Sequence, residues 1–139
     1  MYLIDTNVIG EVRKGDRANP GVRRLFAQAV ASGSRLYLSA VTIGELRRGV
    51  ELIRHRGDRV QADLLEAWLG EVQGDYAEHI LSLDADVAQV WGRLRVPHPE
   101  NVLDKQIAAT ALVHDLDLAT RNTQDFRGTG VRVIDPFSD

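Results

Sequence analysis

The feature that most constrains the fold is an alternation of short apolar runs with longer amphipathic segments along the whole chain. Runs of this length are typical of buried strands. The clearest are residues 2–5, 36–39, 117–120 and 131–135, while 80–83 is either a further strand or an extended connection. Strands that alternate with helices form parallel sheets covered on both faces. The sequence therefore predicts an α/β sandwich with a central parallel sheet of four to five strands.

Helical segments lie between these runs, and several carry start and stop signals. Asn19 and Pro20 suit the N-cap and first turn of a helix that ends at Gly33. Its apolar stripe is predicted to hold Val22, Leu25, Phe26, Ala29 and Val30. The other helices are expected at residues 6–12, from Thr42 to about Arg56, at 60–75, after a cap at Asp84, and from near Val102.

The composition is that of an ordinary globular protein, with 44% hydrophobic and 27% charged residues. No apolar run approaches the ~18 residues that a membrane span needs, and no signal peptide precedes Asp5. The chain has no cysteine, which excludes disulfides and thiolate metal sites and fits a reducing compartment. We therefore expect a cytoplasmic protein with no membrane association.

Acidic residues stand where the predicted strands end or where the helices after them begin. They are Asp5, Glu45, Asp104 and Asp125. Ligands of parallel sheets bind beyond the carboxyl ends of the strands. If these ends share one edge of the sheet, the carboxylates repel one another unless a cation lies among them. Mg²⁺ and Mn²⁺ prefer such oxygen ligands, so the pattern predicts a divalent metal site.

Each carboxylate also has a purely structural explanation. Asp5 and Asp125 are suited to cap a helix or a turn, and Asp104 would interact favourably with the macrodipole at a helix N-terminus. Thr42 and Glu45 match the capping box, in which both side chains bond to backbone N–H groups. The spacing alone leaves both interpretations open.

Four segments together resemble a known family. They are LIDTNVI with Asp5, LSAVTIGELRRG with Glu45, DKQIAATAL with Asp104, and LATRNTQDF with Asn122 and Asp125. In this order they closely resemble the PIN-domain ribonucleases, in particular the VapC-type toxins of type II toxin–antitoxin systems. The final VRVIDPF resembles the FitB-like subgroup. The resemblance implies one PIN domain over residues 1–139, an α/β/α sandwich with endoribonuclease activity.

The resemblance also implies roles for individual residues. Asp5, Glu45 and Asp104 match the acidic positions that hold Mg²⁺ or Mn²⁺ in the family. The fourth acidic position falls on Asn122, which adds no charge, and Asp125 is the nearest substitute. The residues expected to orient the ligands by hydrogen bonds are Thr6, Asn7, Thr120 and Asn122. The bound ion would activate water and polarise the phosphodiester, leaving a 5′-phosphate and a 3′-hydroxyl.

The charge is distributed unevenly along the chain, although the net charge is only −3. Residues 1–59 hold eleven Arg and Lys against six Asp and Glu, and residues 60–139 hold six against fourteen. Such asymmetry permits a basic face for a polyanion. Arg47 and Arg48 follow Glu45 closely, so they are candidates for contact with RNA or with an antitoxin, or else they are solvated helix residues.

Several functions remain open at the level of the sequence. The leading one is a toxin that cleaves RNA as a homodimer and is neutralised by a VapB-like antitoxin, both partners being implied by the resemblance. The alternatives are a PIN ribonuclease of RNA processing outside any toxin module, and a degenerate PIN fold that only binds RNA or a protein. A haloacid dehalogenase phosphatase is discounted because Asn7 stands where its second Asp is needed. The glycine-rich nucleotide-binding motifs G-x-G-x-x-G and G-x-x-x-x-G-K-[ST] are both absent from the sequence.

Overall fold

The computed structural model describes residues 1–138, which fold around a five-stranded sheet. The strands are β1 (Tyr2–Ile4), β2 (Leu36–Ser39), β3 (Ile80–Leu81), β4 (Asp117–Ala119) and β5 (Val133–Ile134). They lie in the order β3-β2-β1-β4-β5, and every neighbouring pair is parallel. The predicted parallel sheet is confirmed, and within the run at 80–83 the residues Ile80–Leu81 form a strand at its edge.

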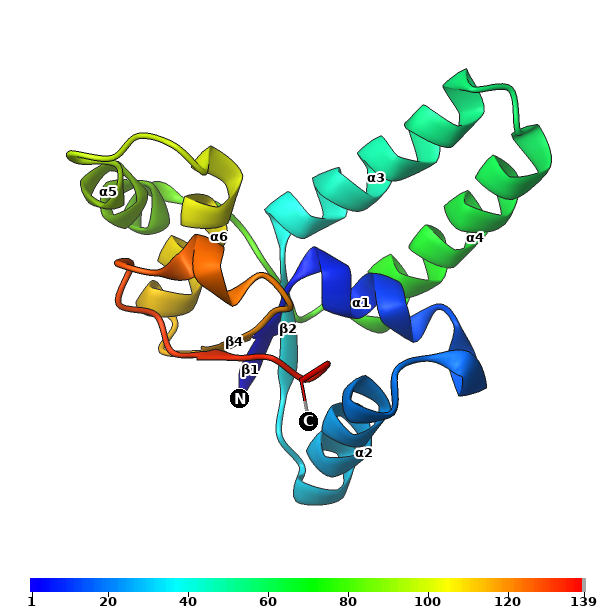
Figure 1. Ribbon diagram of the computed structural model, residues 1–139, viewed down its shortest axis with the longest axis horizontal. Helices are drawn as coiled ribbons and strands as arrows, with labels where there is room; N and C mark the ends of the chain where they lie inside the picture. The colour runs from blue at the N-terminus through cyan, green and yellow to red at the C-terminus, as the bar shows by residue number, and fades with distance from the viewer. Residues whose placement is uncertain (139) are drawn as a thin grey trace.

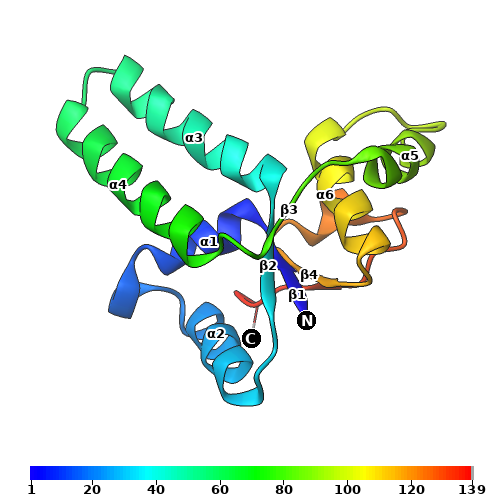
Figure 2. The same ribbon diagram turned by 180° about the vertical axis from the view of Figure 1, so that it is seen from behind.

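Helices connect the strands and cover both faces of the sheet. They are α1 (Thr6–Val12), α2 (Pro20–Ser32), α3 (Ala40–His55), α4 (Arg59–Asp75), α5 (Ala85–Leu94) and α6 (Val102–Val113), with 3₁₀ turns η1 (Gly15–Arg17) and η2 (Thr123–Phe126). Helices α3 and α4 pack against each other as an arm that projects away from the sheet (Figure 1). Figure 2 shows this arm and the α5–α6 pair on opposite sides of the strands.

The core divides into two layers because successive side chains of a strand point to opposite faces. Ile4 of β1 packs with residues of α1, α2 and α4 on one face. Leu3, its neighbour in the same strand, packs with α6 and Phe126 of η2 on the other. Both strand residues are fully buried, so β1 is anchored on both sides and its carboxyl end has a fixed position.

The helix boundaries confirm most of the expected signals and correct two details. Asn19 caps α2 through hydrogen bonds from Gly21 and Val22, and Gly33 ends this helix with a φ of 69°. Helix α3 begins at Ala40, two residues before the predicted start at Thr42. Val30, expected in the apolar stripe of α2, is 83% exposed, because it lies about 80° around the helix from Val22. None of the helices within residues 1–138 is long and apolar enough to cross a membrane.

Candidate metal centre at the strand ends

Asp5 lies directly beyond the buried strand β1 and is itself 4% exposed. It is the N-cap of α1: its Oδ1 accepts a hydrogen bond of 2.8 Å from the backbone N–H of Thr6. Its other oxygen, Oδ2, accepts a 2.8 Å hydrogen bond from the Thr120 hydroxyl. The structural explanation for Asp5 is therefore correct in part, but a cap alone requires neither this burial nor the second bond.

Thr120 follows β4, the strand beside β1, and connects the two strand ends. Its fully buried hydroxyl donates to Asp5 and lies 3.1 Å from the backbone N–H of Asn122, which donates to it. Asn7 reaches the same loop, because its Oδ1 accepts from the Arg121 N–H at 3.1 Å and its Nδ2 lies 3.5 Å from the Thr120 hydroxyl. These contacts hold the Asp5 carboxylate in one orientation.

The capping box that the sequence allowed as a structural explanation for Thr42 and Glu45 does not form at the start of α3. Ser39 is the N-cap of α3, and its hydroxyl accepts from the Val41 N–H. Thr42 lies inside the helix, fully buried, with its hydroxyl 3.4 Å from that of Thr6 in α1. Glu45 therefore lies in the second turn of α3, beyond the first turn where it was expected, and its carboxylate has no capping role.

Asp104 and Asp125 approach the same edge from the other side of the sheet. Asp104 lies in the first turn of α6, as predicted, and is half-buried. Asp125 lies in η2, the 3₁₀ turn that follows Asn122, and its N–H donates to the Asn122 carbonyl. Helix α6 packs against both α3 and η2. Four elements thus carry one carboxylate each towards the end of β1.

Burial and mutual repulsion act together on these carboxylates. Burial raises the pKa of Asp5 above its ordinary value, the bonds from Thr120 and Thr6 oppose that rise, and the charges of Glu45 and Asp125 add to it. Burial also raises the pKa of Asp104 to about 6, with further contributions from Asp5, Asp125 and Glu45. Each of these shifts means that a charged carboxylate is unfavourable here without a cation beside it.

The donor set fits a hard divalent ion that keeps part of its water. All four side chains offer carboxylate oxygens, which Mg²⁺ and Mn²⁺ prefer. Within residues 1–138, no three acidic or imidazole side chains are close enough to form a complete metal site. Mg²⁺ is commonly held by one or two carboxylates, with water in its other positions, so a finished protein cage is not required.

Arg47 and Arg48 have different surroundings, although they are adjacent in α3. Arg47 Nη1 contacts Glu66 Oε1 of α4 at 2.7 Å, beside Arg54, whose Nη2 lies 3.1 Å from the same oxygen. Hydrogen bonds from Arg47 and Arg54 lower the pKa of Glu66. Arg48 is exposed, and within residues 1–138 its side chain has no hydrogen bond or ion pair.

Two further residues near the site were not predicted. Thr42 links α3 to α1 near the carboxylates through its contact with Thr6. A sequence signal for this inward side chain exists, because Thr42 lies one turn before Leu46 on the apolar side of α3. Arg13, the C-cap of α1, lines a pocket of about 280 Å³ together with Thr6 and Glu45. The rest of that pocket is mainly apolar side chains of α3 and α4.

Comparison with known proteins gives consistent matches. The pattern of the PIN domain matches residues 2–131. The chain is 34% identical to Toxin FitB of Neisseria gonorrhoeae, over 100% of both chains. It is 32% identical to VapC ribonuclease Y4jK of Sinorhizobium fredii, covering 99% of this chain and 98% of that one. The crystal structure of FitAcB from Neisseria gonorrhoeae is similar over 100% of both chains, with a TM-score of 0.83 and 32% identity.

Proposed function

The chain belongs to the PIN-domain family, and from this premise we propose that it is a metal-dependent endoribonuclease and the toxin of a toxin–antitoxin module. One relative is named a ribonuclease and another a toxin, and both align along nearly the whole chain. We also propose that all 139 residues form a single PIN domain. These relatives favour the toxin over an RNA-processing enzyme outside such a module.

The observation that carries the proposal is the unbalanced charge around Asp5. This carboxylate is almost completely buried, and the charges that raise its pKa belong to other carboxylates. Burying a charged group without an opposite charge is costly. A protein that only binds RNA gains nothing from such a cluster, whereas a nuclease needs it to hold a divalent cation.

In this proposal Asp5 and Asp104 hold Mg²⁺ or Mn²⁺, with Glu45 and Asp125 completing the acidic set. When bound, the ion supplies charge neutralisation at the phosphodiester and lowers the pKa of water. Asn122 contributes through its backbone N–H, which bonds to Thr120. Thr6, Asn7 and Thr120 keep Asp5 oriented through the hydrogen bonds described above.

The protein side chains would then act on water and the phosphodiester. Glu45 accepts a proton from the attacking water, whose oxygen forms the new bond to phosphorus. The bond from phosphorus to the 3′-oxygen breaks, and that oxygen takes a proton from solvent water. The products are a 3′-hydroxyl and a 5′-phosphate. Asp104 must be ionised to take part, and burial and repulsion make this harder below about pH 6.

The proposed partners follow from the same relatives. We propose a VapB-like antitoxin that neutralises the chain, because the similar solved structures include the FitAB complex bound to a DNA fragment. The homodimer implied by the family resemblance stays a prediction, and analytical ultracentrifugation of the free chain tests it. We also propose a cytoplasmic site of action, because the absence of cysteine fits a reducing compartment.

The direct test is cleavage of total RNA by the purified chain with Mg²⁺, with Mn²⁺ or with EDTA. We expect discrete cuts that require the metal and are lost in Asp5→Asn, which removes one charge and keeps the side-chain shape. Asp16→Asn makes the same change at an exposed position in η1 and should cleave normally. A folded, antitoxin-free chain that cuts no RNA with either metal would leave only the binding function.

A further inference from the structure

The structure also points to the surface along which RNA would lie, an inference that deepens the proposed nuclease function and rests on it. We propose that the face of α3 opposite α4, carrying Arg48 near Glu45 and Arg56 at the far end, binds the phosphate backbone of single-stranded RNA next to the cleavage site. The partner class is thus a flexible polyanion, and the residues that recognise it are unpaired arginines on one helix.

The position of Arg48 follows from helix geometry. The side of α3 that packs inward is marked by Leu46 and by Val50, which is 3% exposed. Arg48 is two residues from each of them, so it lies about 160° around the helix from both. Glu45 is three residues earlier and shares a side with Arg48. The guanidinium therefore lies one turn from a proposed metal ligand and faces away from α4.

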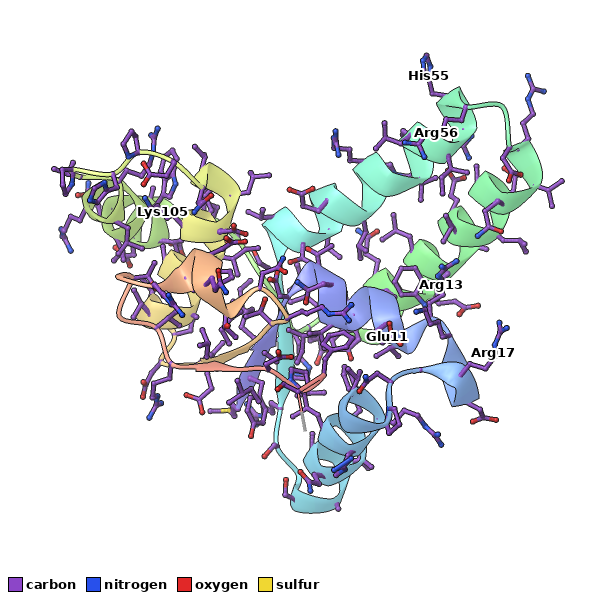
Figure 3. All side chains as sticks on the ribbon, viewed as in Figure 1. Glu11, Arg13, Arg17, His55, Arg56 and Lys105 are labelled. Carbon is purple, nitrogen blue, oxygen red and sulfur yellow. The ribbon has the colours of Figure 1, made fainter. Side chains whose placement is uncertain are left out.

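The same face continues towards the end of the arm. Leu52 and His55 are four and seven residues after Arg48, at helical spacing on its side, and both are exposed. His55 and Arg56 lie at the end of α3 that is farthest from the sheet (Figure 3). Arg56 is exposed and, in the described part of the chain, its guanidinium has no partner. Arg56 is the C-cap of α3 and lies eight residues from Arg48. The two α-carbons are therefore about 12 Å apart along the helix axis and about 80° apart around it, with Arg48 and Arg56 on either side of Leu52.

Charge pairing separates this face from the rest of the arm. Arg47 and Arg54 are both bonded to Glu66, and Arg54 also contacts Glu51 and Asp63. Glu51, the acid nearest to Arg48 in the following turn, is thereby neutralised by Arg54. Arginines already paired with carboxylates bind phosphate poorly. Among the arginines of α3 and its C-cap, all within the described residues, Arg48 and Arg56 have no partner and are left to bind a polyanion.

The opposite side of Glu45 does not suit a phosphate backbone. The pocket there is lined by Leu46, Val50, Ile53, Leu65 and Trp68, with Arg13 as its one basic residue among those that line it. Phosphate oxygens need hydrogen-bond donors or water, which such apolar walls do not supply. An RNA chain entering the acidic edge is therefore favoured along the arginine face.

The test measures RNA affinity as a function of salt concentration, in a variant of the chain that cannot cleave RNA. In an Asp104→Asn background with Mg²⁺, binding of a mixed-sequence single-stranded oligoribonucleotide is followed by fluorescence anisotropy. Each phosphate contact contributes a slope of about 0.7 to the fall of log affinity with log salt. Arg48→Gln should reduce the slope by about 0.7, and adding Arg56→Gln should reduce it by about 1.4.

Two variants serve as matched controls. Arg47→Gln removes the same charge from the neighbouring residue, which is paired with Glu66, and should leave the slope unchanged. Arg48→Lys keeps the charge and should retain the slope. In the cleaving chain, Arg48→Gln should raise KM with little change in kcat, because it contacts RNA away from the reacting atoms.

Equal losses in Arg47→Gln and Arg48→Gln would overturn the proposal, since net charge alone would then explain the binding. An unchanged slope in Arg48→Gln would also overturn it, and weakened antitoxin binding in that variant would assign the residue to the antitoxin. Failure of the nuclease proposal is recognised separately: the slope would respond to Arg48→Gln while the wild-type chain shows no metal-dependent cleavage.

Discussion

Charged side chains gather in two places, on the α3–α4 arm and at the strand-end edge, where Asp5, Glu45, Asp104 and Asp125 lie. On the arm opposite charges pair, whereas at the edge Asp5 is surrounded by charges of its own sign. On the arm, Arg47 and Arg54 pair with Glu51, Asp63 and Glu66 at 2.5 to 3.5 Å, and all of these residues are exposed except Arg54, which is one-third exposed. At the edge, Asp5 is buried and is surrounded by like charges. Exposed balanced pairs add little to stability and are readily explained as structural. Like charges around the buried Asp5 oppose folding, so this cluster calls for a functional explanation.

The largest expected effect is on RNA cleavage, which should depend on the edge carboxylates and not on those of the arm. Asp104→Asn and Glu45→Gln each remove a carboxylate from the edge, and we expect RNA cleavage to fall by about 100-fold or more, because metal and water are both less well held. Glu66→Gln removes a carboxylate from the arm and should change the cleavage rate less than about twofold. Initial rates on a fluorogenic RNA at saturating Mg²⁺ give the comparison. Similar losses in all three variants would contradict the assignment.

A smaller effect is expected from the residue that orients Asp5. Thr120→Val keeps the shape of a fully buried side chain and removes the 2.8 Å hydrogen bond to Asp5 Oδ2. We expect a loss of metal affinity of about 10-fold, the lower end of the range for residues that orient ligands. Isothermal titration with Mn²⁺ measures it.

Thr120→Ser retains the hydroxyl and serves as the control, with near wild-type affinity. If Val and Ser lowered the affinity equally, packing rather than the hydrogen bond would be responsible, and Thr120 would lose its role in orienting Asp5.

The pH dependence of stability should show the repulsion at the edge. The pKa of Asp104 is about 6 in the folded chain against 3.8 without the fold, so the folded state binds more protons between these values. The contribution of Asp104 to the unfolding free energy of the metal-free protein is therefore fully present below about pH 4 and is lost as the pH rises to about 6. Urea unfolding at several pH values, compared with Asp104→Asn, isolates this contribution. If the wild type instead became more stable relative to Asp104→Asn as the pH rose over this range, the raised pKa of Asp104 would be contradicted.

The smallest effect is expected on the arm. Glu66→Gln should lower the melting temperature slightly at low salt, because two ion-pair contacts are lost, and the difference should disappear at 1 M salt, where the Debye length is only about 3 Å. Differential scanning calorimetry at two salt concentrations measures this. A large effect that persists in high salt would show that the arm depends on these pairs for its fold.

Much of the fold was predictable from local patterns. The alternation of strands and helices gave the parallel sheet, and Asn19, Pro20 and Gly33 marked the ends of α2 correctly. These signals act within a few residues. The errors concern contacts between residues that are far apart in the sequence. Val30 is exposed although it extends an apolar stripe, because the rim of a helix is buried only where another element covers it.

The site could be predicted as a set of residues but not as a geometry. Asp104 stands in the first turn of α6 as expected, and Asp5 lies beyond its strand. The capping-box pattern made a cap one possible role for Thr42 because that pattern is local, whereas its contact with Thr6 joins two helices that are far apart in sequence. The distinction between Arg47 and Arg48 likewise depends on Glu66 in another helix, which spacing within α3 does not reveal.

The central claim is that the edge carboxylates oppose folding until a divalent ion binds them, and thermal unfolding without RNA tests it most directly. Without metal, Asp104→Asn should be more stable than the wild type, by about 1 kcal/mol after allowance for its partial exposure. Mg²⁺ at about 100 times its dissociation constant should then stabilise the wild type by about 2.7 kcal/mol and the variant far less. A wild type whose melting temperature is unchanged by Mg²⁺ and Mn²⁺, and which is no less stable than Asp104→Asn without metal, would contradict the claim.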